Sequence, residues 1–119
     1  MSETGGGRRG RPPSSPELTR LRAEIDELDR RIVGLLNQRA ELARSVGHEK
    51  AAIGRRAVRD REREREVLLR VSIANEGPMS QVDLLAIYRR LIAATLALEI
   101  AERERLGRDE DEPPEPPGA

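Results

Sequence analysis

A stripe of apolar residues between positions 18 and 46 constrains this chain more than any other feature of its sequence. Its members recur at alternating spacings of three and four residues: Leu18, Leu21, Ile25, Leu28, Ile32, Leu35, Leu42 and Val46. This spacing is typical of one amphipathic helix with a coiled-coil-like seam. Ser15 and Pro16 favour a helix start, because serine can cap a free N–H and proline in the first turn loses no hydrogen bond. We therefore predict a helix over residues 16–52.

This predicted helix is too long for a chain of 119 residues that folds alone. At 1.5 Å per residue it measures about 54 Å, more than the diameter of a compact globule of this size. We expect a second chain to cover the overhang. Gly34 lies inside the helix, costs up to about 1 kcal/mol relative to alanine, and could mark a close helix contact.

The stripe has a gap at Arg39, where the pattern calls for leucine. A buried guanidinium is tolerated only beside an anion, which is either a protein carboxylate or a ligand. Lys50 follows about three helical turns later, on the same face. Two cations are therefore expected to point the same way.

Two shorter helices are predicted downstream. Asp60 can cap a helix over residues 61–75, after a loop over 53–59 that has clustered charges and no helical stripe. Much of the charged run RDREREREVLLR is expected to be a solvated helix face with i,i+4 ion pairs. Gly77 and Pro78 end this helix.

Ser80, with Asp83 three residues later, forms a capping-box-like start for a third helix over residues 80–106. Thr95 and Glu99 lie one turn apart on or beside its apolar face. Periodicity alone thus predicts an all-α domain over residues 16–106. The Gly-, Arg- and Pro-rich residues 1–15 and the acidic, Pro-rich residues 107–119 are expected to be disordered.

Composition excludes several classes of function. Lys+Arg and Asp+Glu balance at 22 each, and Tyr88 is the one aromatic residue, which argues against a nucleic-acid partner. The chain has no cysteine for disulfides or thiolate metal sites, and His48 is expected to be an ordinary surface residue rather than a ligand or base. No apolar run approaches a membrane span or a secretion signal, so we expect a cytoplasmic protein without a membrane partner.

From the residues alone, two interpretations of the ionisable groups stay open. Glu99 could join Arg39 or Lys50 in an internal salt-bridge network, because buried charges pair. Alternatively, the cations bind an anionic ligand.

The run LTRLRAEIDELDRRIVGLLNQRAELARSVGHEKAAIG, then AVRDREREREVL and IYRRLIAATLALE, resembles the all-helical class of chorismate mutase. The resemblance covers about residues 16–105 and needs no gap inside the helices. It implies an intertwined homodimer of three-helix chains with shared active sites. The implied activity is the pericyclic rearrangement of chorismate to prephenate, a step of phenylalanine and tyrosine biosynthesis that needs no metal or cofactor. The resemblance leaves open whether a partner enzyme of the same pathway activates this protein.

Carried over residue by residue, the resemblance implies a set of substrate-binding residues: Arg22 from the partner chain, Arg39, Lys50, Asp60, Arg63, Glu64, Thr95 and Glu99. Arg39, Lys50 and Glu99 are the implied catalytic residues. The arginines would bind the carboxylates, with Arg63 at the ring end, and Asp60 and Glu64 would hold the ring-hydroxyl region.

Helical geometry agrees on one independent point. Arg22 lies roughly 100° around the helix from Arg39, so it points toward a different site. Pairing of an exposed Arg22 with Asp26 or Asp29 is the alternative.

The sequence departs from the common family pattern at three positions. Thr95 stands where serine is usual, Glu99 where many members have glutamine, and Arg59 at a position often hydrophobic or aromatic. Arg59 could alter substrate affinity or simply face solvent. Two alternative functions remain: an isochorismate-pyruvate lyase of the same fold, and a non-catalytic regulatory helical dimer.

Overall fold

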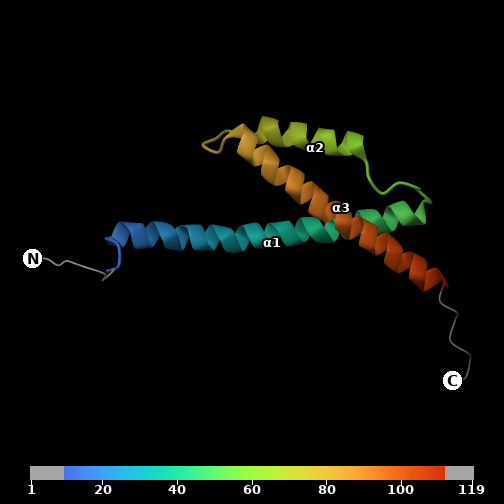
Figure 1. Ribbon diagram of the computed structural model, residues 1–119, viewed down its shortest axis with the longest axis horizontal. Helices are drawn as coiled ribbons and strands as arrows, with labels where there is room; N and C mark the ends of the chain where they lie inside the picture. The colour runs from blue at the N-terminus through green and yellow to red at the C-terminus, as the bar shows by residue number, and fades with distance from the viewer. Residues whose placement is uncertain (1–9, 112–119) are drawn as a thin grey trace, which may run out of the picture. The chain divides into compact units, whose positions relative to one another are not determined.

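The computed structural model describes residues 10–111, which form three α-helices and no strand. They are α1 (Pro16–Ala52), α2 (Arg61–Ala74) and α3 (Gln81–Asp111), shown in Figure 1. The predicted all-α class with one very long helix is confirmed. No helix in this described range is long and apolar enough to cross a membrane. The chain divides into two compact units at Leu36 and Asn37, within α1.

The first unit contains the N-terminal part of α1. Ser15 caps the helix, since its Oγ accepts a hydrogen bond from the N–H of Leu18 at 3.0 Å. Arg20 pairs with Glu17 and Glu24 along the polar side. The apolar stripe in this unit stays exposed, from 44% at Leu21 to 60% at Leu35. Its further exposed members are Ile25, Leu28 and Ile32.

The second unit contains the rest of α1, the loop 53–60, α2 and α3. Asp60 caps α2, because its Oδ1 accepts a hydrogen bond from the N–H of Arg63 at 3.0 Å. In α3, the Oγ of Ser80 accepts from the N–H of Asp83 at 3.1 Å. These local caps fix where both helices begin. The two helices pack side by side as a hairpin (Figure 1).

The hairpin turn is organised by its own polar groups. Gly77 has a φ of +78°, a conformation that glycine adopts without strain, and its N–H donates to Asn75 Oδ1 at 3.0 Å. Asn75 Nδ2 donates to Gln81 Oε1 at 3.0 Å, and Gln81 Nε2 donates to the carbonyl of Ser72 at 2.9 Å. The turn therefore ties the end of α2 to the start of α3.

A glycine sets the close approach of α1 and α3. A Cβ added at Gly47 would lie 2.8 Å from the carbonyl oxygen of Glu99 and 2.9 Å from its Cα. Only glycine fits this crossing without a shift of the backbone. At Gly34 a Cβ would meet no described atom of this chain within 4 Å, so the helix contact expected there stays a prediction for a partner chain.

The third helix ends later than expected, at Asp111 rather than near 106. Its last turns are rich in strong helix formers, and Arg105 pairs with Glu102 three residues earlier at 2.6 Å. Proline at position 113 disfavours helix at the residue before it. Residues 107–111, which were expected to belong to the disordered tail, are therefore part of α3. Residues 1–9 and 112–119 lie outside the described part of the chain.

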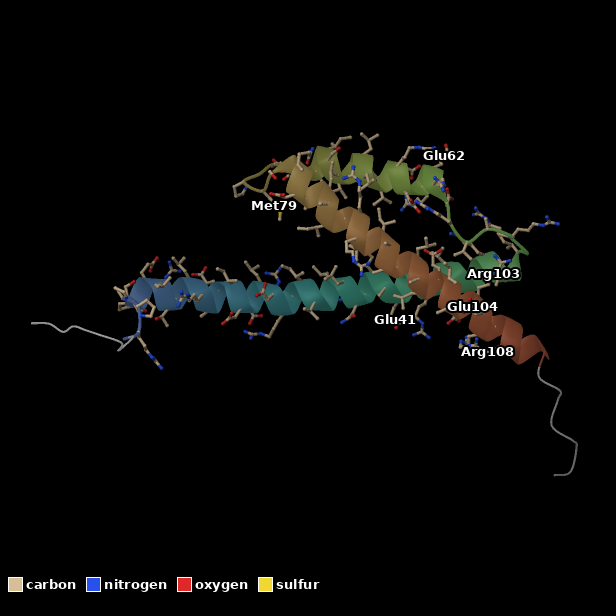
Figure 2. The ribbon with its side chains drawn as sticks, in the orientation of Figure 1. Glu41, Glu62, Met79, Arg103, Glu104 and Arg108 are labelled. Atoms are coloured by element: carbon tan, nitrogen blue, oxygen red, sulfur yellow. The ribbon has the colours of Figure 1, made fainter. Side chains whose placement is uncertain are left out.

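Exposed charges lie along both α2 and α3, and those on α2 agree with the solvated helix face expected for the charged run. Glu62 on α2 and Glu104 on α3 are exposed and labelled in Figure 2. Glu66 accepts from Arg63 at 2.6 Å and pairs with Arg70 at 3.3 Å. Such solvated pairs contribute little to stability individually.

Candidate active site

A cavity of about 470 Å³ lies within the second unit, between the C-terminal part of α1, the loop 53–60, α2 and α3. Its apolar lining consists of Leu42, Ala43, Val46, Val58, Val67, Ile92 and Leu96. Its polar lining consists of Arg39, Lys50, Asp60, Arg63, Glu64, Thr95 and Glu99. The structure thus brings together every predicted site residue except Arg22.

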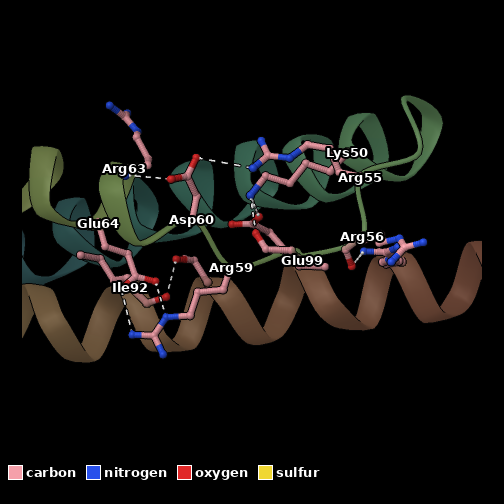
Figure 3. A network of polar contacts seen from close by, with 12 residues as sticks. Lys50, Arg55, Arg56, Arg59, Asp60, Arg63, Glu64, Ile92 and Glu99 are labelled. Carbon is pink, nitrogen blue, oxygen red and sulfur yellow. Dashed lines mark hydrogen bonds and ion pairs between the residues drawn. The ribbon is translucent and has the colours of Figure 1, made fainter.

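Lys50 and Glu99 form an ion pair inside this cavity. Lys50 Nζ donates to Glu99 Oε1 at 2.9 Å and to the carbonyl oxygen of Val58 at 2.6 Å (Figure 3). The two side chains are only 13% and 15% exposed. The crossing at Gly47, one turn before Lys50, brings α3 within reach of the ammonium. The salt bridge expected as one interpretation is therefore present for Lys50.

Arg39 differs from Lys50 in its surroundings. Its Nη1 donates to Thr95 Oγ1 at 3.3 Å, and the Thr95 hydroxyl lies 3.1 Å from the carbonyl oxygens of Leu91 and Ile92. Thr95 is buried at 6% exposure. Among the residues that the structure describes, the half-buried Arg39 pairs with no carboxylate. A half-buried guanidinium of this kind favours an anionic ligand.

The start of α2 places two more charged residues at the cavity. The pKa of the Asp60 carboxyl lies below its ordinary value, chiefly because the carboxylate accepts the N–H of Arg63 and also because the cations of Arg55 and Lys50 are near. Arg63 lines the cavity, but its guanidinium donates to Glu66 at 2.6 Å and points away from Glu99 in Figure 3.

Glu64 is held by Arg59, whose role the sequence left open. Arg59 donates to both Glu64 oxygens, from Nε at 3.0 Å and from Nη2 at 3.1 Å. This contact raises the pKa of Arg59, mainly through the hydrogen bond. Arg59 neither lines the cavity nor points freely into solvent.

The sequence profile of the chorismate mutase type II family matches residues 21–100, and this range includes all the polar residues of the cavity. The chain belongs to this family.

Curated relatives of this chorismate mutase type II chain carry the name bifunctional chorismate mutase/prephenate dehydratase. The chain is 40% identical to the one from Aquifex aeolicus over 87 residues, which cover 70% of this chain and 24% of that protein. It is 37% identical to the one from Stutzerimonas stutzeri over 87 residues, with the same coverage of each. The relative from Neisseria gonorrhoeae is 37% identical over 78 residues, 66% of this chain and 21% of its own length. The chain thus spans about a quarter of the length of these relatives.

Arg22 is the predicted residue that this chorismate mutase type II chain does not contribute to its own cavity. It lies on the exposed N-terminal part of α1, in the first unit. In the described range it forms no ion pair with Asp26 or Asp29, the alternative considered from the sequence. Its donation to a partner's site stays a prediction.

A second charged cluster of this chain lies outside the cavity. Glu102 is 8% exposed and accepts from Arg105 Nη2 at 2.6 Å, with Arg44 at 3.7 Å and His48 Nδ1 at 3.8 Å. The hydrogen bond from Arg105 is the main cause that lowers the pKa of Glu102. The 58% exposure of His48 agrees with its interpretation as a surface residue. Sequence reasoning missed Glu102, although it lies three residues after Glu99 on the same helix.

The cavity contains three carboxylates, those of Asp60, Glu64 and Glu99. Over the residues described, no cluster of three or more His, Cys, Asp or Glu side chains is arranged as a metal site. Its polar groups are guanidinium, ammonium, hydroxyl and carboxylate, and these can bind and orient a polyanion.

Proposed function

We propose that this chain catalyses the rearrangement of chorismate to prephenate in the biosynthesis of phenylalanine and tyrosine. The observation that carries the proposal is the half-buried Arg39, which pairs with no described carboxylate in a cavity that also holds Lys50. Chorismate is a dianion, and an arginine fork binds a carboxylate through two parallel hydrogen bonds. Membership of the chorismate mutase type II family agrees with this assignment.

The proposed chemistry is intramolecular, because one carbon–oxygen bond breaks as one carbon–carbon bond forms. Arg39, together with Arg22 of a partner chain, orients the carboxylates so that the substrate is held in a compact reactive conformer. Arg63 assists at the ring end. To do so, its guanidinium would have to leave Glu66, to which it donates in this structure, and bind the substrate instead. The hydroxyl of Thr95 accepts a hydrogen bond from the Arg39 guanidinium and helps to hold it in place.

Negative charge grows on the ether oxygen as the reaction proceeds. The Lys50 ammonium, held by the Val58 carbonyl and Glu99, is preorganised beside the cavity to stabilise that charge. Glu99 would donate a second hydrogen bond there in its protonated form, in place of the ion pair with Lys50 that the structure shows. Asp60 and Glu64 would receive the ring-hydroxyl region of the substrate.

The working form in this proposal is an intertwined homodimer with two shared sites. The exposed apolar stripe of the first unit supports it, because a long row of half-exposed leucines and isoleucines needs a covering surface. The direction of Arg22, roughly 100° around the helix from Arg39, is a second support. A second copy of α1 would supply both the cover and the missing arginine.

The names of the relatives combine chorismate mutase with prephenate dehydratase. They support an enzyme whose product passes to a further enzyme of the same pathway, and a cytoplasmic location is part of the proposal. Activation by such a partner enzyme belongs to the proposal and would appear as a rise in kcat/KM when the two proteins are mixed.

The deciding experiment follows the ultraviolet absorbance of chorismate with the purified chain of residues 1–119. We expect the wild-type chain to consume chorismate and the Lys50→Ala chain to lose most of its turnover while remaining helical by circular dichroism. Isochorismate is assayed in parallel. Turnover of isochorismate alone would identify a lyase, and a folded dimer inert toward both compounds would identify a non-catalytic module.

A further inference from the structure

The contact between Arg59 and Glu64 is the best-defined polar contact beside the cavity that the proposed mechanism does not use. Arg59 is the last loop residue before the cap of α2, and its guanidinium engages both carboxylate oxygens of Glu64 (Figure 3). Glu64 is 20% exposed, whereas Arg59 is 51% exposed. The fork therefore approaches the carboxylate from its outer side.

Glu64 lies in the wall between two hollows. One is the cavity of the candidate active site. The other has a volume of about 380 Å³ and contains Arg59 in its lining, with Leu68, Arg89, Ile92, Ala93 and Leu96. Arg59 belongs only to this second hollow, so it reaches Glu64 from the side opposite the proposed substrate.

A carboxylate can accept about four hydrogen bonds, two on each oxygen. The fork of Arg59 uses one on each oxygen and leaves the others for a hydroxyl group in the main cavity. Without Arg59, the flexible Glu64 side chain would have to be ordered anew at each binding event. A bidentate contact restricts the carboxylate more than a single point charge does.

We propose that Arg59 is a positioning residue that holds the Glu64 carboxylate ready to accept the ring hydroxyl of the substrate. The proposal rests on the proposed function. It assigns Arg59 no contact with the substrate itself, because Arg59 does not line the main cavity.

The expected effect of Arg59 on KM and kcat depends on where negative charge develops in the substrate during the reaction. The ring hydroxyl is bound alike in the ground state and the transition state, so an interaction with it changes KM rather than kcat. We expect Arg59→Ala to raise KM by about tenfold, the effect typical of one misdirected charge-assisted hydrogen bond, with kcat within about twofold of wild type. Arg59→Lys should also raise KM, because an ammonium cannot reproduce the fork.

A double-mutant cycle separates positioning from direct attraction of the dianionic substrate. If Arg59 acts through Glu64, then Arg59→Ala has no further effect on KM in a Glu64→Ala background. If Arg59 attracts the substrate directly, the two effects multiply, and the proposal is overturned. A wild-type KM in Arg59→Lys would overturn it as well.

Arg70→Ala is the matched control, because Arg70 is an exposed α2 arginine paired with Glu66 at 3.3 Å outside both hollows. It should leave KM unchanged, and equal thermal midpoints for all variants would exclude a folding defect. The chorismate assay of the wild-type chain keeps the two proposals apart. No wild-type turnover means that the proposed function fails, whereas normal turnover with an unchanged KM in Arg59→Ala means that only this inference fails.

Discussion

Among the charged residues of the cavity, Arg39 has the surroundings that most favour an anionic ligand. It is half-buried, contacts the hydroxyl of Thr95 at 3.3 Å and has no carboxylate partner among the residues that the structure describes. Lys50, by contrast, already has Glu99 at 2.9 Å. The internal salt-bridge network considered from the sequence therefore accounts for Lys50 and not for Arg39, whose binding of a ligand stays a prediction.

Arg39→Lys tests this assignment. A lysine keeps the charge but loses the planar fork, so we expect kcat/KM for chorismate to fall by about tenfold or more. Arg65→Lys, at an exposed α2 position outside the cavity, is the control and should behave as wild type. Near-normal turnover of Arg39→Lys would return Arg39 to a purely structural role.

Glu99→Gln tests the proposed hydrogen-bond donor. An ionised carboxylate cannot donate and would repel the charge that develops on the ether oxygen, so activity that depends on neutral Glu99 declines as the pH rises. Glutamine donates at any pH, so the variant should stay active with a flatter alkaline side. The measurement is turnover of wild type and variant from about pH 5 to 9, the range in which general acid–base groups are usually profiled. If the pH profiles of wild type and Glu99→Gln coincide, or if the variant folds but is inactive, Glu99 is not this donor.

At the scale of the elements, local signals in the sequence predicted the helix starts well. Ser15, Asp60 and Ser80 all cap helices, because a capping side chain bonds within its own three or four residues. The contacts that build the site were harder to foresee. The crossing at Gly47 depends on which residue of another helix arrives there, and periodicity within one helix carries no such information.

The same reason explains the two polar contacts that the sequence left unresolved. Arg59 reaches Glu64 from a loop whose path is set by the packing of α2 on α3. Glu102 is buried by residues of α1 that lie far from it in the chain. The family resemblance supplied the residues that line the cavity, because it carries tertiary information that spacing lacks.

Gly47→Ala tests the helix crossing. The new methyl group would lie 2.8 Å from the Glu99 carbonyl oxygen, so α1 and α3 must separate, at a cost of about 1–3 kcal/mol in the free energy of unfolding. Because Lys50 and Glu99 lie on the separated helices, kcat should fall together with the thermal midpoint. Gly34→Ala is the control, since its methyl group meets no described atom, and it should raise stability by up to about 1 kcal/mol.

Glu102 should make stability depend on pH. Its pKa is lowered in the folded chain, mainly by Arg105, so the ionised carboxylate stabilises the fold above its ordinary titration range near pH 4.3. This contribution is lost as the pH falls through the lowered pKa. We expect Glu102→Gln to have a lower thermal midpoint than wild type at pH 7, with the difference shrinking at pH 3. A constant difference between the two pH values would contradict this account.

At the scale of the whole molecule, the exposed stripe of the first unit is the dominant feature. Leucines and isoleucines along α1 remain 44% to 60% exposed, and this apolar surface supports the proposed dimer. If the fold is completed only in the dimer, its thermal midpoint must fall on dilution, since dissociation precedes or accompanies unfolding.

Shared sites can be tested by complementation. Arg22→Ala and Arg39→Ala homodimers should each be inactive, because each lacks one arginine in both sites. When the two chains are refolded together, each heterodimer should regain one intact site, giving about a quarter of the wild-type number of sites after random pairing. Activity that does not return, although heterodimers form, would show that Arg22 serves no partner site.

Arg22 and Arg39 lie on one helix, in different units, and this arrangement bears on the genetics of the enzyme. Under the proposed sharing, an allele that has lost only one of these arginines still completes one site whenever its product pairs with a normal chain. An allele that has lost both completes neither, because the normal chain then lacks a working counterpart in each site. With random pairing of equal amounts of normal and altered chains, one lesion would leave about half of the sites intact and the two lesions together about a quarter.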